Sequence, residues 1–261
     1  MIEQRRPAHP PVLPDRSALD AVVFDVGGVF VMRHPEPVRT ALGELGLDVP
    51  ADPQHYRRAH HHGVRAMSDL VVRTGPVDEY DPHLWRYWEL AYLRHLGVPE
   101  DRLEEAAHHL VAAAATLPVA QVWRLVLAEN VEGLHRIIAS GMPVAVVSNN
   151  DGTAEEQLRL FGVCQVGPGP LPSITCVVDS GVVGVAKPDP TIFAPALAAL
   201  GTVAARTLYV GDTVHADVHG ATAAGMPVIQ LDPYQLHTDH DHLRLPDLTA
   251  LADLLGTATT S

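Results

Sequence analysis

The sequence predicts an α/β fold, with a doubly wound, Rossmann-like parallel sheet as its core and a helical cap domain inserted into it. Three observations support this prediction. Short apolar runs alternate with helical patterns along most of the chain, which is typical of a parallel sheet with helices on both faces. One stretch of helical patterns without a strand interrupts this alternation after the first run. The chain of 261 residues is long enough for a core domain with such an insertion.

Four apolar runs rich in β-branched residues are predicted to be the strands. They span residues 21–24, 143–147, 206–210 and 227–231, and each is followed by a polar residue or a glycine. Helical patterns between and after them cover residues 129–140, 152–161, 190–200, 215–224 and 246–255. Ligands of such sheets bind at the carboxyl ends of the strands, where the strand order reverses. We therefore expect Asp25, Ser148 and Asp212 to meet at this edge.

The interruption also predicts the domain organisation. Residues 1–18 form a disordered leader, residues 34–117 the helical cap, and residues 19–33 and 118–261 the core. An insertion that leaves the sheet soon after Asp25 lies above its carboxyl edge, where it can exclude water and select substrates. An ordinary helical subdomain is the simpler alternative. Trp85, Tyr87 and Trp88 are expected to pack within this segment, one of them at the substrate entrance.

Composition excludes several classes of partner. A net charge of -13 and a pI near 5.6 argue against a surface for nucleic acid or for an anionic membrane. No stretch approaches the roughly 20 apolar residues of a membrane span. The two cysteines, Cys164 and Cys176, are too few for a disulfide framework. We therefore expect a cytoplasmic protein that binds neither nucleic acid nor membrane.

Polar side chains gather at the predicted strand ends. In chain order they are Asp25, Ser148, Asn149, Lys187, Asp212 and Asp217. Carboxylates at one sheet edge repel one another unless a cation joins them, and oxygen ligands favour Mg²⁺. The serine hydroxyl and the neighbouring amides can bind phosphate oxygens, while the lysine supplies a fixed positive charge. Each residue alone is equally well explained by a helix cap, a turn or a solvated surface, so only their joint order indicates a phosphoryl site.

This order of residues resembles that of the haloacid dehalogenase superfamily of aspartate-nucleophile phosphohydrolases. The resemblance covers about residues 21–255 and is strongest in VAKPDPTIF at 185–193 and YVGDTVHAD at 209–217. It implies that Asp25 attacks phosphorus to form an aspartyl-phosphate, that Ser148 binds a phosphoryl oxygen, and that Lys187 neutralises the nucleophile and the transferring group. It also implies an Mg²⁺ site whose ligands are Asp25, the backbone carbonyl of Gly27, Asp212, and Asp217 directly or through water.

Gly27 departs from the family pattern. Members with Asp at this position use it to protonate the leaving group and then to activate water, and Gly27 can do neither. General acid–base catalysis contributes roughly 10²–10⁴-fold, so the other groups can still support slow turnover, or faster turnover of a substrate with a good leaving group. His34 and His215 are the candidates for a substitute acid or base, although an ordinary loop histidine is the simpler interpretation of each.

Two further histidine clusters are interpreted as surface features. His60, His61 and His62 are predicted to form a solvated face of the cap, because adjacent helical residues point in different directions and cannot share one metal ion. The second cluster comprises His237, Asp239, His240, Asp241 and His242. It follows the last predicted strand and is expected to be a polar turn that binds at most an adventitious cation.

The sequence thus predicts an Mg²⁺-dependent phosphatase that cleaves a phosphate monoester of a small metabolite through Asp25. The alternative is a catalytically weak, phosphate-binding or regulatory protein that keeps the fold, because Gly27 replaces the acid. A dehalogenase would use the same Asp25 against carbon without a metal, which the pair Asp212 and Asp217 disfavours. A phosphomutase depends more heavily on the missing acid. A receiver domain is excluded by the chain length and the insertion.

Overall fold

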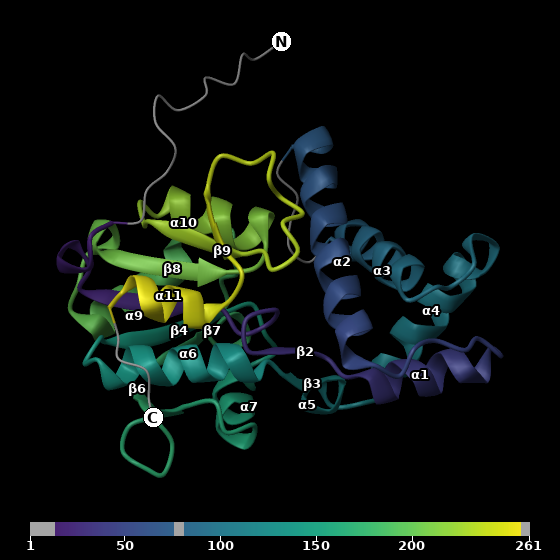
Figure 1. Cartoon of the computed structure of the whole chain (residues 1–261), viewed down its shortest axis with the longest axis horizontal. Helices are drawn as coiled ribbons and strands as arrows, with labels where there is room; N and C mark the ends of the chain where they lie inside the picture. Colours follow the sequence, from purple (N-terminus) through teal and green to yellow (C-terminus); the bar gives the residue numbers. More distant parts are fainter. Residues whose placement is uncertain (1–13, 76–80, 257–261) are drawn as a thin grey trace.

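A six-stranded sheet forms the centre of the computed structural model, which describes residues 14–75 and 81–256 (Figure 1). Its strands are β1 (Ala21–Phe24), β4 (Val144–Ser148), β7 (Val177–Asp179), β8 (Thr207–Gly211), β9 (Val228–Leu231) and β10 (Leu243–Leu245). All pairs are parallel, in the order β10-β9-β8-β1-β4-β7. The chain adds β4 and β7 on one side of β1 and later β8 to β10 on the other. The strand order therefore reverses at β1, which confirms the predicted doubly wound fold.

Helices cover both faces of this sheet. Residues of β1 alternate between two apolar layers, with Val22 and Phe24 in one and Val23 in the other. The first layer includes side chains of α6 (Ala128–Ala139), α7 (Ala154–Leu160) and α11 (Leu248–Leu254). The second includes side chains of α9 (Ala194–Leu200) and α10 (His219–Ala223). Burial on both sides explains why the central strands are continuously apolar in sequence.

Four helices between β1 and β4 form a separate unit, called here the helical block (Figure 1). They are α1 (Pro35–Glu44), α2 (Pro53–Thr74), α3 (Pro82–His95) and α4 (Leu103–Ala114), and they enclose an apolar core of their own. The first three start at a proline, and the side chain before it, His34, Asp52 or Asp81, accepts a hydrogen bond from the second helical residue. Within 34–117, the described residues contain helices and no strand, in agreement with the sequence pattern.

A short antiparallel pair, β2 (Val31–Arg33) and β3 (Trp123–Val126), carries the chain from the sheet to the helical block and back. Here the Arg33 guanidinium lies 2.8 Å from both carboxylate oxygens of Glu89 in α3. The same guanidinium stands 4.6 Å from the ring centroid of Trp88. The Glu89 side chain is only 3 % exposed, so a buried ion pair connects β2 to α3 of the helical block.

The loop after β9 folds against α2, as the yellow-green segment in Figure 1 shows. Arg65 of α2 donates hydrogen bonds to both carboxylate oxygens of Asp239 and to the carbonyl of Leu236. His237 is buried, with its Nε2 3.1 Å from the hydroxyl of Ser68. The prediction of a polar surface turn is therefore wrong for His237, because the loop packs on a helix that the sequence did not indicate.

The predicted solvated face at His60, His61 and His62 is also wrong for its first two residues. Both His60 and His61 are buried, since α2 packs against α3 and also against the segment that follows β8. His62 is half-buried and stacks on His95 with ring centroids 3.5 Å apart. A helix that is covered on two sides shows no single apolar stripe in its sequence, which explains why His60 and His61 were predicted to be solvated.

Residues 1–13, most of the predicted leader, lie outside the described residues, whereas Arg16–Ala18 form a 3₁₀ turn with Asp15 as its cap. The predicted leader therefore extends too far. Cys164 and Cys176 are both free thiols, and Cys164 is buried. Among the helices of the described ranges, none is sufficiently long and apolar to span a membrane.

Candidate active site

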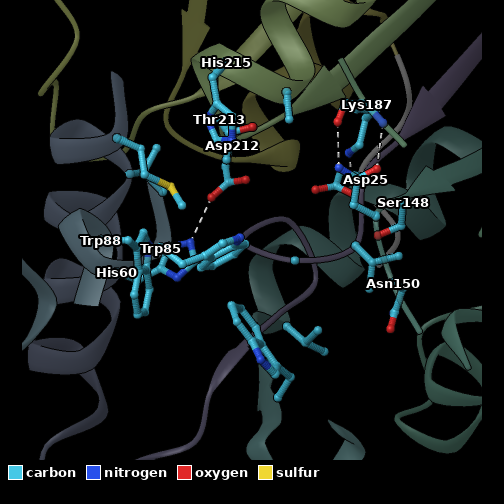
Figure 2. A pocket seen from close by; sticks show the side chains of 18 of the residues that line it. Asp25, His60, Trp85, Trp88, Ser148, Asn150, Lys187, Asp212, Thr213 and His215 are labelled. Carbon is cyan, nitrogen blue, oxygen red and sulfur yellow. Dashed lines mark hydrogen bonds and ion pairs between the residues drawn. The ribbon is translucent and has the colours of Figure 1, made fainter. Parts of the chain in front are cut away.

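Three adjacent strands bring their polar ends to one cavity. Asp25 directly follows β1, Ser148 ends β4 and Asp212 directly follows β8. All three line a cavity of about 200 Å³ between the sheet edge and the helical block (Figure 2). Asp217 lies close by, and one carboxylate oxygen from each of Asp25, Asp212 and Asp217 falls within 4.8 Å of the others. Residues far apart in sequence thus meet at the point where the strand order reverses.

Two glycines allow the carboxylates to come this close. Gly28 has a φ of +67°, and a Cβ at this position would lie 1.9 Å from Oδ2 of Asp212. A Cβ on Gly211 would lie 2.2 Å from Cγ of Asp217. Either side chain would displace a carboxylate, so the turn after β1 and the end of β8 require glycine.

Lys187 joins two of these carboxylates. Its Nζ lies 2.8 Å from Oδ1 of Asp25 and 2.6 Å from Oδ1 of Asp217, and it donates a hydrogen bond of 2.9 Å to the hydroxyl of Tyr209. The lysine is almost fully buried. Burial disfavours its charged form, but the carboxylates of Asp217 and Asp25 outweigh that effect and raise the pKa of Lys187. The ammonium group is therefore a permanent positive charge next to Asp25.

The carboxylate of Asp217 receives four donors. Lys187 and the Tyr209 hydroxyl, at 2.8 Å, bond to Oδ1, while the backbone N–H and the hydroxyl of Thr213 donate to Oδ2. Burial opposes ionisation of Asp217, yet the Lys187 charge and these hydrogen bonds lower its pKa. The sequence predicts neither Tyr209 nor Thr213 as a site residue. Both belong to the YVGDTVHAD motif, which is the signal that points to them.

Asn149 has a partner that the sequence did not indicate. Its Oδ1 accepts a hydrogen bond of 2.8 Å from the Lys187 backbone N–H, and its Nδ2 donates to the Lys187 carbonyl at 3.0 Å. The amide therefore holds the lysine backbone in place, while Asn149 also lines the cavity, so its predicted contact with a phosphate stays a prediction. Ser148, which is buried and lines the cavity, keeps the position expected for a group that contacts a ligand.

The charges of the site are unbalanced. Burial raises the pKa of Asp25 to about 7 in spite of the neighbouring Lys187 charge. Burial and the charge of Asp217 raise the pKa of Asp212 well above its usual value. Three carboxylates thus face one ammonium group, which leaves excess negative charge when all are ionised. A cluster of carboxylate oxygens with this excess fits a hard divalent cation.

His60 of α2 reaches into the site from the helical block. Its Nε2 lies 2.8 Å from Oδ2 of Asp212, as the dashed line in Figure 2 shows. Burial, followed by the charge of Arg33, lowers the pKa of His60 to about 3, so the neutral ring donates its Nε2–H to the carboxylate. The signal in the sequence is weak but present: His60, Val64 and Met67 share one helix face, and all three line the cavity.

The two histidines predicted as substitute acids differ in position. His34 is not among the residues that line the cavity, and its Nδ1 accepts the Glu36 N–H at the start of α1. The sharper prediction for His34 is therefore wrong, because closeness in sequence to Gly27 does not bring it to the cavity. His215 is buried and does line the cavity.

The three aromatic residues of α3 that were expected to pack within the helical block lie in different environments. Trp88 is buried in the core of the helical block and also lines the cavity, as expected. Trp85 is 37 % exposed and lines the cavity. Tyr87 is 43 % exposed and lies under the guanidinium of Arg73, so the expectation that it packs inside the helical block is wrong.

Comparisons with known proteins agree with this geometry. A family model described as haloacid dehalogenase-like hydrolase matches residues 19–225. The phosphoserine phosphatase of Thermus thermophilus is 40 % identical over 67 residues, which cover 26 % of this chain and 27 % of that enzyme. The chain thus matches about a quarter of the length of this curated relative.

Solved structures share the fold across most of the chain. A HAD phosphatase from Thermococcus onnurineus aligns with a TM-score of 0.53 and 20 % identity, over 93 % of this chain and 100 % of that one. A 2-haloacid dehalogenase from Pseudomonas syringae pv. Tomato aligns with a TM-score of 0.51 and 22 % identity, over 91 % of this chain and 98 % of that one. Both reactions are thus found on this fold, and only the site can distinguish between them.

Proposed function

Because the chain belongs to the haloacid dehalogenase-like hydrolase family, we propose that it is an Mg²⁺-dependent phosphatase that acts on a phosphate monoester of a small molecule through Asp25. The observation that carries this proposal is the buried ion pair of Asp25 and Lys187 beside the carboxylate of Asp212. A nucleophile, a fixed positive charge and a set of oxygen ligands within one cavity are the groups that phosphoryl transfer requires.

Each residue has a role in this proposal. A carboxylate oxygen of Asp25 attacks phosphorus and forms an aspartyl-phosphate, which water then cleaves. Lys187 favours ionisation of Asp25 against the effect of burial and neutralises charge on the transferring group, while the Ser148 hydroxyl donates to a phosphoryl oxygen. His215, which lines the cavity, stays the candidate for a substitute acid or base.

The metal would be held by Asp25, Asp212 and the backbone carbonyl of Gly27. When bound, Mg²⁺ supplies positive charge that balances the carboxylates and the phosphate. Asp217, whose two oxygens already accept four hydrogen bonds, would act through water and through its hold on Lys187. The ranges 34–117 and 19–33 with 118–261 would then be the cap and the core of a cytoplasmic enzyme.

The test is release of inorganic phosphate from a panel of small phosphate monoesters, with Mg²⁺ and with EDTA. We expect metal-dependent release that Asp25→Asn abolishes. The matched control is Asp20→Asn, which changes an exposed aspartate just before β1 and leaves the cavity untouched. Release that persists in Asp25→Asn contradicts the covalent mechanism.

Two other functions make different predictions. A regulatory or phosphate-binding protein, favoured by the glycine at position 27, would show no metal-dependent release from any substrate of the panel. A dehalogenase would release halide from a short 2-haloacid in EDTA. Because Asp212 and Asp217 have no role in attack on carbon, the carboxylate cluster favours the phosphatase.

A further inference from the structure

The cavity has two chemically different walls. At the sheet edge it is lined by the polar groups of Asp25, Ser148 and Lys187. The wall formed by the helical block and by the chain that returns from it is lined by His60, whose Nε2 faces Asp212, and otherwise by Val64, Met67, Trp85, Trp88, Val119 and Trp123. Figure 2 shows Trp85 and Trp88 on the side of the cavity away from Lys187 and Ser148. Among the described residues that the helical block contributes to the cavity, none is Lys, Arg, Asp or Glu.

Such a wall selects against charged and strongly polar groups. A charged or hydroxyl-rich group placed there would lose its hydration against a mostly apolar surface that offers few hydrogen-bonding partners in return. An apolar ring, in contrast, would bury its surface against three indoles, which prefer edge-to-face and offset contacts with other rings. The tilted pair of Trp85 and Trp88, with centroids 6.1 Å apart at 56°, offers this kind of surface. The wall therefore matches a neutral aromatic group.

Gly27 points to the same class of substrate for an independent reason. It lines the cavity but carries no side chain that could protonate a departing oxygen. The pKa of a phenol is about 10, whereas that of water is about 15.7, so a phenolate departs with much less need of a proton donor than an alkoxide. An aryl leaving group thus suits both the wall and the glycine.

We propose that the substrate is a phosphate monoester of an uncharged phenol, with its ring against the tryptophan wall and its phosphoryl group at Asp25. This inference rests on the proposed function. In the first step an oxygen of Asp25 forms a bond to phosphorus, the bond between phosphorus and the aryl oxygen breaks, and its electron pair leaves as a phenolate that takes a proton from solvent. Water then cleaves the aspartyl-phosphate, which returns the carboxylate and releases inorganic phosphate.

The experiment compares kcat/KM in Mg²⁺ for four substrates. Phenyl phosphate carries the proposed group, 4-carboxyphenyl phosphate adds a charge to the ring, cyclohexyl phosphate is apolar but has a poor leaving group, and acetyl phosphate has a good leaving group without a ring. We expect phenyl phosphate to exceed the carboxylated ester by at least about tenfold and cyclohexyl phosphate by at least about 100-fold.

Two variants separate recognition of the ring from leaving-group chemistry. Trp85→Ala removes a partly exposed side chain of the wall and should lower the preference for phenyl over acetyl phosphate by about tenfold, chiefly through KM. Tyr87→Ala removes a similarly exposed aromatic of the same helix that does not line the cavity, and should leave the preference unchanged.

The outcomes distinguish the two proposals. If Asp25-dependent release occurs from acetyl phosphate but phenyl phosphate has no advantage over its carboxylated analogue, the substrate class is refuted and the phosphatase stands. If Trp85→Ala and Tyr87→Ala show the same preference for phenyl phosphate over acetyl phosphate, the tryptophan wall is refuted as the recognition surface. If none of the four substrates releases phosphate while the wider panel does so in an Asp25-dependent way, the substrate class alone is refuted. If that panel is negative as well, the proposed phosphatase fails, and this inference fails with it.

Discussion

Replacing Gly27 by Asp should give the protein the proton donor that is missing at this position. The position accepts a side chain, since Gly27 is not among the glycines with positive φ, and a Cβ built on it meets only the side chain of Trp123, at 3.9 Å. A new carboxyl group would enter a cavity that is lined by the buried carboxylates of Asp25 and Asp212, with Asp217 close by. Their charge and the burial would raise its pKa and keep it protonated, as a general acid requires.

The expected magnitude depends on the leaving group. General acid catalysis contributes roughly 10²–10⁴-fold, which corresponds to about 2.7–5.4 kcal/mol of activation free energy. For cyclohexyl phosphate, whose alkoxide needs the proton, we expect Gly27→Asp to raise kcat by about 10²-fold, the lower limit, because no evolved contacts orient the new side chain. For phenyl phosphate, whose phenolate departs unaided, the gain should stay below about threefold.

The assay is steady-state phosphate release in Mg²⁺ across pH 5 to 9, with Gly27→Asn as the matched variant. Asparagine has the same shape as aspartate but cannot transfer a proton, so it reports the effect of filling the space. If Gly27→Asp and Gly27→Asn change the turnover of cyclohexyl phosphate equally, position 27 does not limit proton transfer and the reasoning is wrong.

Three further predictions concern the ion pairs and the titration of the site. Glu89→Gln leaves the buried Arg33 without its partner and should lower the free energy of unfolding by about 3–5 kcal/mol in urea titrations. In EDTA, the wild type should lose stability relative to Asp25→Asn as pH rises from about 4 to about 7, because burial raises the pKa of Asp25 from 3.8 to about 7 and only the folded state binds that proton within this window. Calorimetry should report this as a change in the difference between the two melting temperatures, since the buried histidines, whose lowered pKa values act in the opposite direction, are common to both proteins. Lys187→Met should lower kcat/KM by about 10²–10³-fold.

Each of these predictions has its own control. Glu105→Gln breaks an exposed pair with Arg102 and should change stability by less than about 1 kcal/mol, so equal losses at both glutamates would contradict the importance of burial. A difference in melting temperature between the metal-free wild type and Asp25→Asn that stays constant from pH 4 to 7 would contradict the raised pKa of Asp25. Full activity of a folded Lys187→Met variant would remove the ammonium group from the mechanism.

The central strands were predictable to within a residue, because burial on both faces leaves continuous apolar runs that end in polar groups. The edge strands β7 and β10 were not, since each has only three residues and pairs with a neighbouring strand on one side only. Within residues 34–117 the helical character was predictable from the sequence. The burial of α2 on two sides was not, although Asp52 and Pro53 form a recognisable start signal for this helix.

The site could be predicted where strand ends determine position. The doubly wound order alone brings Asp25, Ser148 and Asp212 to one edge. His60 could not be identified in this way, because the face that α2 turns to the sheet depends on how the helical block packs. Nor could the sequence reveal that the Asn149 amide bonds to the Lys187 backbone, since this contact depends on the path of the chain some 38 residues further on.

The four donors on Asp217 have a consequence for the energetics of turnover. A carboxylate whose two oxygens already accept four hydrogen bonds has no reason to rotate when a ligand arrives. Lys187, held on one side by Asp217 and on the other by Asn149, is therefore oriented before any substrate binds. In water, solvent dipoles would have to reorient around a developing charge. Here the protein groups are oriented during folding, so each catalytic cycle begins with the electrostatic field of the site already in place.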